Sequence, residues 1–116
     1  MNYFETYSER NQETSAYHEF QRGGLPSNNT YERNRKDSIF LHDDTMVETE
    51  FYLFLEKQFP QYEFLGAPIS ISKDEWIQTY EVSRDESCVI REIVDELNDW
   101  ATDVFRTERR FSILGI

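Results

Sequence analysis

Three adjacent side chains, His42, Asp43 and Asp44, are of the types that bind metal ions. One imidazole and two carboxylates could contribute to a divalent site, but such a site needs further ligands, and no spaced His or Cys partner supplies them. Acidic residues just before a helix also interact favourably with the positive end of its dipole. We therefore expect Asp43 and Asp44 at a helix start, and we expect neither a metal site nor a cofactor.

Cys88 is the single cysteine of the chain, so no internal disulfide can form. A helix start would lower the pKa of its thiol and favour nucleophilic chemistry, but a lone cysteine beside Val89 and Ile90 is more often a small core residue, and we expect that role. The pair Glu92 and Glu96 could serve acid–base chemistry only in a desolvated cleft, which nothing in the sequence suggests. The sequence also lacks a glycine-rich phosphate loop, a CxxC pair and a nucleophile elbow, so we expect no enzyme and assign no catalytic residue.

Three Ser/Thr-x-x-Glu patterns predict the helix starts that position these side chains. They begin at Thr45, Ser72 and Ser83, where the hydroxyl and the glutamate three residues later can pair with free backbone N–H groups. Apolar residues spaced by three and four predict a helix after each pattern, the last running roughly to Arg106. Pro60 ends the first helix, because the residue before a proline avoids helical geometry.

Short or alternating apolar runs predict strands over residues 38–41, 63–72 and 109–116. The last run is apolar enough that we expect it to pair inside the sheet. The order strand, helix, strand, helix, helix, strand predicts one small α+β or α/β domain over residues 37–116. Its three- to four-stranded sheet packs with about three helices.

Residues 1–36 are rich in Asn, Gln, Ser, Thr, Glu and Arg, with Gly23, Gly24 and Pro26 as breakers. Such a composition buries little apolar surface, so we expect a polar N-terminal arm, partly disordered and loosely docked. Within it, a short helix over residues 12–22, stopped by Gly23, is predicted.

The 116 residues include 12 basic and 23 acidic side chains, for a formal charge of −11. Residues 37–105 hold 17 of the acids against four bases. This balance argues against binding to nucleic acid or to an anionic membrane surface, because like charges repel. There is no apolar run of membrane-spanning length and no export pattern at the N-terminus, and a single cysteine suits a reducing compartment. We therefore expect a cytoplasmic protein.

Five carboxylates recur along the predicted last helix, on the side away from its apolar residues, and form what we call the acidic stripe: Glu92, Asp95, Glu96, Asp99 and Asp103. Like charges at such spacings cost about 0.2–0.5 kcal/mol per pair. The stripe is either a solvated face kept for solubility or a docking face for a basic protein. We predict docking, and we add Asp43 and Asp44 to the predicted partner-binding residues.

A nuclease is the natural partner, because the groove that holds its substrate must be positive. The acidic domain, with LNDW on a late helix and a terminal FSILGI strand, resembles the small bacterial immunity proteins of contact-dependent inhibition and other polymorphic toxin systems. FYLFLEKQFP, ISISKDEW and LNDWATDVF give the resemblance its character, over roughly residues 38–116. It implies a non-enzymatic cytoplasmic protein that binds one cognate toxin tightly.

Two other interpretations stay open. A phage-encoded mimic of nucleic acid, aimed at a restriction or CRISPR system, would have the same density of acids. A small regulatory interaction domain is the second. Both differ from an immunity protein in the partner they bind.

Overall fold

Nine elements of secondary structure make up the described part of the chain, in a computed structural model that covers residues 2–11, 13, 16–26, 31–63 and 67–116. In chain order they are β1 (Phe4–Thr6), β2 (Tyr17–Arg22), β3 (Ile39–His42), α1 (Asp43–Glu48), α2 (Phe51–Gln58), β4 (Ile69–Ser72), α3 (Lys73–Ser83), α4 (Cys88–Val104) and β5 (Arg110–Leu114). The Cα radius of gyration, 13.2 Å, is that of a compact single domain of this length.

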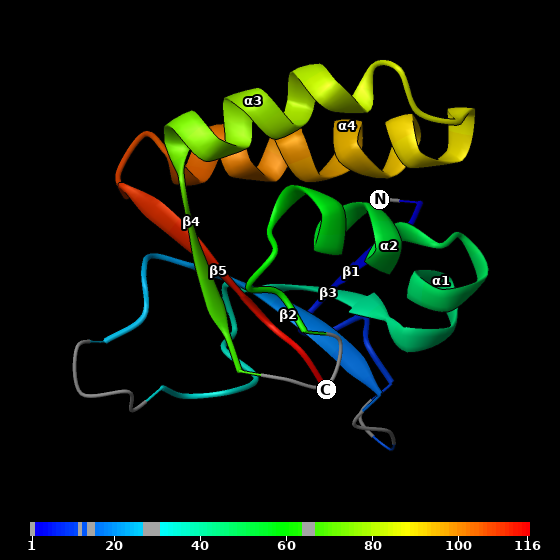
Figure 1. Ribbon diagram of the computed structural model, residues 1–116. Coiled ribbons are helices and arrows are strands. Elements are labelled where there is room, and N and C mark those ends of the chain that lie inside the picture. The colour runs from blue at the N-terminus through cyan, green and yellow to red at the C-terminus, as the bar shows by residue number, and fades with distance from the viewer. Residues whose placement is uncertain (1, 12, 14–15, 27–30, 64–66) are drawn as a thin grey trace.

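The five strands form one antiparallel sheet in the order β1-β3-β2-β5-β4. Figure 1 shows α3 and α4 running side by side along one side of the sheet, with α1 and α2 below them. Strand β2 lies in the middle, where Phe20 is opposite Ile39 of β3 and Ile113 of β5. The fold is therefore a mixed domain with an antiparallel sheet, in which the helices and the sheet share one core.

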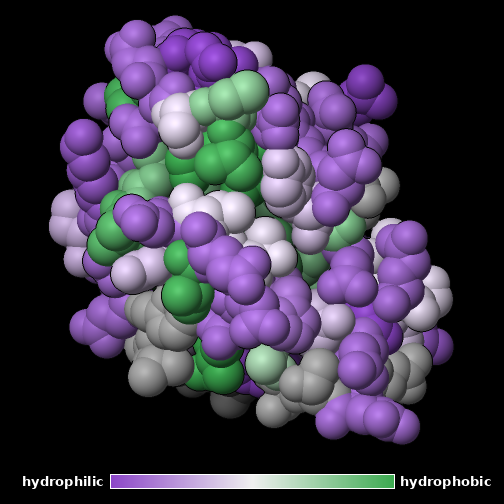
Figure 2. Space-filling model, turned by 90° about the vertical axis from the view of Figure 1, so that its right-hand side faces the viewer, coloured by the Kyte–Doolittle hydropathy of each residue, from purple (hydrophilic) through white to green (hydrophobic). Residues whose placement is uncertain are grey.

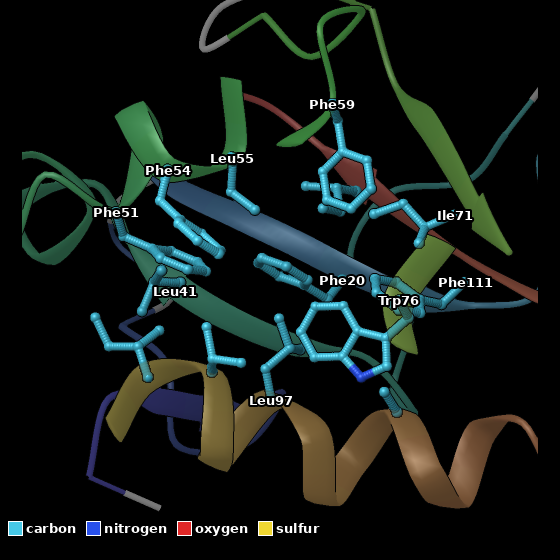
Figure 3. Packing of buried hydrophobic residues seen from close by; sticks show 14 of the residues in the cluster. Phe20, Leu41, Phe51, Phe54, Leu55, Phe59, Ile71, Trp76, Leu97 and Phe111 are labelled. Atoms are coloured by element: carbon cyan, nitrogen blue, oxygen red, sulfur yellow. The ribbon is translucent and has the colours of Figure 1, made fainter. Parts of the chain in front are cut away.

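The helix-covered face of the sheet carries the main apolar core. Figure 3 shows side chains from α2, α4 and the sheet pointing toward one another around Phe20. Trp76 of α3 meets Phe111 of β5 edge-on, with ring centroids 5.6 Å apart. On α4, the buried residues recur every three or four positions and face this core: Ile90, Ile93, Val94, Leu97, Ala101 and Val104.

The opposite face of the sheet carries buried polar residues, among them Gln21 and Ser112. Glu19, which is 2 % exposed, lies at its centre. Its Oε1 accepts the Asn34 N–H (2.6 Å), and its Oε2 accepts the Arg35 N–H (2.9 Å), the Ser38 hydroxyl (2.7 Å) and the Gln21 amide (2.9 Å). These four donors offset the cost of taking a carboxylate out of water. Three of them, Asn34, Arg35 and Ser38, tie the loop before β3 to the middle strand.

The helix predicted over residues 12–22 is wrong where the structure describes it, because Tyr17–Arg22 form β2. Residues 12, 14 and 15 lie outside the described residues. Strand β2 pairs with both β3 and β5, and Phe4–Thr6 form the edge strand β1. These parts of the N-terminal segment belong to the sheet and are not a loosely docked arm. Their polar side chains misled the prediction, since Glu19 and Gln21 are buried with partners rather than solvated.

The sheet therefore has five strands, rather than three or four, and four helices accompany it. The fourth helix arises because the predicted first helix is divided in two. Helix α1 ends at Glu48, and Glu50, with a φ of 61°, stands in the left-handed region before α2 begins. A non-glycine residue is uncommon in that region, and no sequence pattern predicted the break between α1 and α2.

The three predicted helix caps have different outcomes. Ser72 forms the predicted capping box with Glu75 and is confirmed. The box at Thr45 is wrong, because Thr45 lies inside α1 and the cap is His42, whose Nδ1 accepts the Asp44 N–H at 3.0 Å. The box at Ser83 is also wrong, because α3 runs to Ser83. The last helix starts instead after Ser87, whose hydroxyl accepts the Ile90 N–H, and it ends at Val104, before the predicted limit.

The predicted strands near 38–41 and 109–116 are found as β3 and β5. Of the strand predicted over 63–72, β4 occupies Ile69–Ser72, while residues 64–66 lie outside the described residues. Among the described helices, none is both long enough and apolar enough to cross a membrane.

Candidate functional site

The acidic stripe lies on the side of α4 that faces away from the core, as predicted. Four of its five residues are exposed, and Glu96 is half-buried. The sole basic residue of the helix is Arg91. The 3.6-residue period of a helix accounts for this separation of apolar and acidic sides.

Glu92 and Glu96 are used within the fold. Glu96 Oε1 accepts the N–H groups of Phe4 (2.7 Å) and Tyr3 (3.0 Å), and Oε2 accepts that of Asn2 (3.0 Å). The Tyr3 hydroxyl donates a hydrogen bond to the Glu92 carboxylate, and this bond is the main reason that the pKa of the Tyr3 phenol is raised. These two carboxylates therefore hold the start of the edge strand β1 against α4.

Asp95 and Asp103 form ion pairs at the surface. Asp95 Oδ1 lies 2.8 Å from Arg84 Nη2, and Asp103 Oδ2 lies 2.9 Å from Arg22 Nη1. Among the described residues, Asp99 alone of the stripe has neither a hydrogen bond nor an ion pair. Surface pairs of this kind contribute about 0–1 kcal/mol each, so Asp95 and Asp103 are available to a competing cation at small cost.

Asp43 and Asp44 are the first residues of α1, in agreement with the sequence prediction of a helix start. No hydrogen bond or ion pair of the described chain joins either of them to α4. Asp43 Oδ1 is 3.4 Å from Nε2 of the fully buried His18, whose Nδ1 is 3.4 Å from the Tyr62 hydroxyl. Burial lowers the pKa of His18, against the opposing effect of Asp43, and raises that of Tyr62.

His42 and Asp43 therefore have separate partners. His42 caps α1, while Asp43 pairs with His18. Across the described residues, no group of three or more His, Cys, Asp or Glu side chains is placed to hold a metal ion.

Cys88 is exposed, so the expectation of a core residue is wrong. It is the first residue of α4, and its Sγ lies 3.6 Å from Glu92 Oε1. The helix turns its apolar side inward from Ile90 onward, which leaves Cys88 at the solvent-facing end.

In the described part of the chain, grooves border α4 on two sides. Between α3 and α4 a groove of about 320 Å³ is lined by apolar, neutral polar and basic side chains: Lys73, Trp76, Ile77, Asn98, Thr102, Phe105 and Arg106. Between α2 and the start of α4 a second groove, the α2–α4 groove, has a volume of about 220 Å³ and carries two glutamates. Sequence reasoning missed both grooves. The second is lined in part by Glu50, the left-handed residue that precedes α2, and no local pattern indicated that break.

Comparison of the chain with protein-family models, with curated proteins and with solved structures finds no match in any of the three.

Proposed function

We propose that this chain is a non-enzymatic binding protein whose acidic surface docks on a strongly basic protein, in particular a cognate toxin such as a nuclease. The observation that carries the proposal is the outward side of α4. Four carboxylates are exposed along it, and Arg91 is the one base of the helix. Like charges at this spacing lower helix stability. The positive charges of a basic partner would offset this repulsion and attract the same carboxylates.

The pairing pattern supports this use of the surface. Asp99 is free of partners in the described structure, and Asp95 and Asp103 make only surface ion pairs. A partner's arginine or lysine can replace Arg84 or Arg22 at little cost. Complementary fields also raise the association rate and fix the orientation of the complex. Binding over the substrate groove of a nuclease would exclude nucleic acid without any chemical step.

The proposal is tested by charge reversal at Asp95 and Asp99. The tagged protein is used to capture partners from its source organism, which are eluted by rising salt and identified by mass. We expect one basic protein, whose dissociation constant rises at least about tenfold for the variant Asp95→Lys/Asp99→Lys. The control is Glu56→Lys/Glu63→Lys, which makes the same change of net charge at two exposed positions outside α4.

Equal weakening by both variants would show that only net charge matters and would contradict a docking face on α4. Capture of a restriction or CRISPR component would support the nucleic-acid mimic instead. Unchanged binding of every partner by Asp95→Lys/Asp99→Lys would leave the stripe as a solvated face.

A further inference from the structure

The α2–α4 groove combines an apolar floor with an acidic end. Leu53 and Phe54 of α2 and Ile90 of α4 supply the apolar part, and Leu53 is 44 % exposed. Glu50 and Glu86 line the same groove. Figure 2 looks at this side of the molecule and shows hydrophobic residues gathered in its upper part, bordered by hydrophilic ones.

The two glutamates differ from most acids of the stripe because they are unpaired. Among the described residues, neither the Glu50 nor the Glu86 carboxylate has a hydrogen bond or an ion pair. Both lie near helix N-termini, whose partial positive charge stabilises a carboxylate. That partial charge does not neutralise the full negative charge of either side chain. The groove thus presents two carboxylates beside apolar surface that is open to solvent.

Lys57 also lines the groove. It follows Glu50 by seven residues on α2, which corresponds to about 10 Å along a helix axis. Among the described residues, no ion pair joins Lys57 to Glu50 or Glu86. The groove therefore carries two carboxylates and one ammonium group, for a net negative charge.

From this arrangement we infer that the α2–α4 groove is an anchor site for an arginine side chain of a basic partner. The inference rests on the proposed function and adds a specific contact to it. The aliphatic stem and flat face of the arginine lie on Leu53 and Ile90, and its guanidinium lies between the two glutamates. Arginine suits the site better than lysine, because its guanidinium is planar, less strongly hydrated and able to bind two carboxylates at once.

The test uses fluorescently labelled nona-arginine as the probe, with dissociation constants measured by anisotropy at low ionic strength. Two double variants remove the same charge: Glu50→Gln/Glu86→Gln in the groove and Asp95→Asn/Asp99→Asn on the stripe. We expect the groove variant to raise the dissociation constant about tenfold and the stripe variant less than threefold. Leu53→Ala, which changes no charge, is expected to raise it about threefold for nona-arginine and to leave nona-lysine binding unchanged.

The outcomes separate this inference from the proposed function. A larger effect of the stripe variant would overturn the arginine anchor and leave the proposed function supported. Equal effects of the two double variants, or an unchanged dissociation constant for Leu53→Ala, would reduce the groove to general electrostatic attraction and overturn the anchor alone. Absence of any binding to the unmodified chain would count against both.

Discussion

The buried site around Glu19 and the α2–α4 groove show two opposite uses of a carboxylate. Glu19 is removed from solvent and accepts four hydrogen bonds from residues that cover the polar face of the sheet. Glu50 and Glu86 lie in an open groove and, in the described structure, their carboxylates accept none. The first region uses negative charge to assemble the fold, and the second leaves it unsatisfied at the surface.

This difference divides the acids of a chain whose net charge is −11. Glu19, Glu96 and Asp43 have defined partners within the domain. Asp99, Glu50 and Glu86 have no such partner among the described residues. We attribute structural roles to the first group and partner binding to the second, and the two groups should respond differently to neutralisation.

The largest effect is expected for Glu19→Gln. A glutamine has one acceptor oxygen and a donating amide, so it cannot accept from all four donors, and buried N–H groups lose their partners. Each loss costs about 1–3 kcal/mol, so we expect the free energy of unfolding to fall by about 3 kcal/mol in urea titrations. Hydrogen exchange should quicken first at the Asn34 and Arg35 amides. Unchanged stability with unchanged exchange at those two amides would show that Glu19 does not hold the loop.

A smaller loss is expected for Glu96→Gln, because this side chain is only half-buried. Three N–H groups at the start of the chain lose a charged acceptor, and we expect a loss of about 1–2 kcal/mol. Asp99→Asn is the matched control on the same helix and should leave stability within about 0.5 kcal/mol. Equal losses of stability in the two variants would contradict the view that Glu96 holds the fold and Asp99 does not.

The burial of His18 predicts a dependence of stability on pH. Because burial lowers the pKa of His18 in the folded state, the unfolded chain takes up a proton first as the pH falls below about 6.5. Stability is therefore constant above that pH and falls below it, by at most about 1.4 kcal/mol per pH unit from this residue. His18→Gln should remove this slope.

His42→Gln serves as the control for that slope, since His42 is an electrostatic neighbour of His18 but is only half-buried. It should retain most of the dependence. If the slope survives His18→Gln and vanishes with His42→Gln, the pH dependence comes from His42, and the prediction for His18 is wrong.

Sequence reasoning was accurate for several features that neighbouring residues decide, although the capping boxes predicted at Thr45 and Ser83 were wrong. The Ser72 capping box, the apolar side of α4 and strands β3 and β5 depend on neighbours within a few residues. The same helical period correctly placed four stripe residues on the surface.

It was inaccurate where distant residues decide. Strand β2 contains Glu19 and Gln21. The Glu19 carboxylate accepts from donors 15 to 19 residues later in the chain and from the Gln21 amide. Composition alone therefore suggested a polar arm. The partners of Asp103 and Glu96, namely Arg22 and residues 2–4, are also far away in the chain, so periodicity could show which acids face outward but not which are already paired.

The smallest effect is the most informative, and it is expected for the triple variant Asp99→Asn/Glu50→Gln/Glu86→Gln. Removing three unpaired carboxylates relieves repulsion in a strongly acidic chain, while the favourable contact of Glu50 and Glu86 with helix N-termini is lost. These terms oppose one another, so the free energy of unfolding, measured in urea beside Glu19→Gln, should change by less than about 1 kcal/mol. A loss of about 3 kcal/mol, matching that of Glu19→Gln, would show that these carboxylates also hold the fold and would contradict the division proposed here.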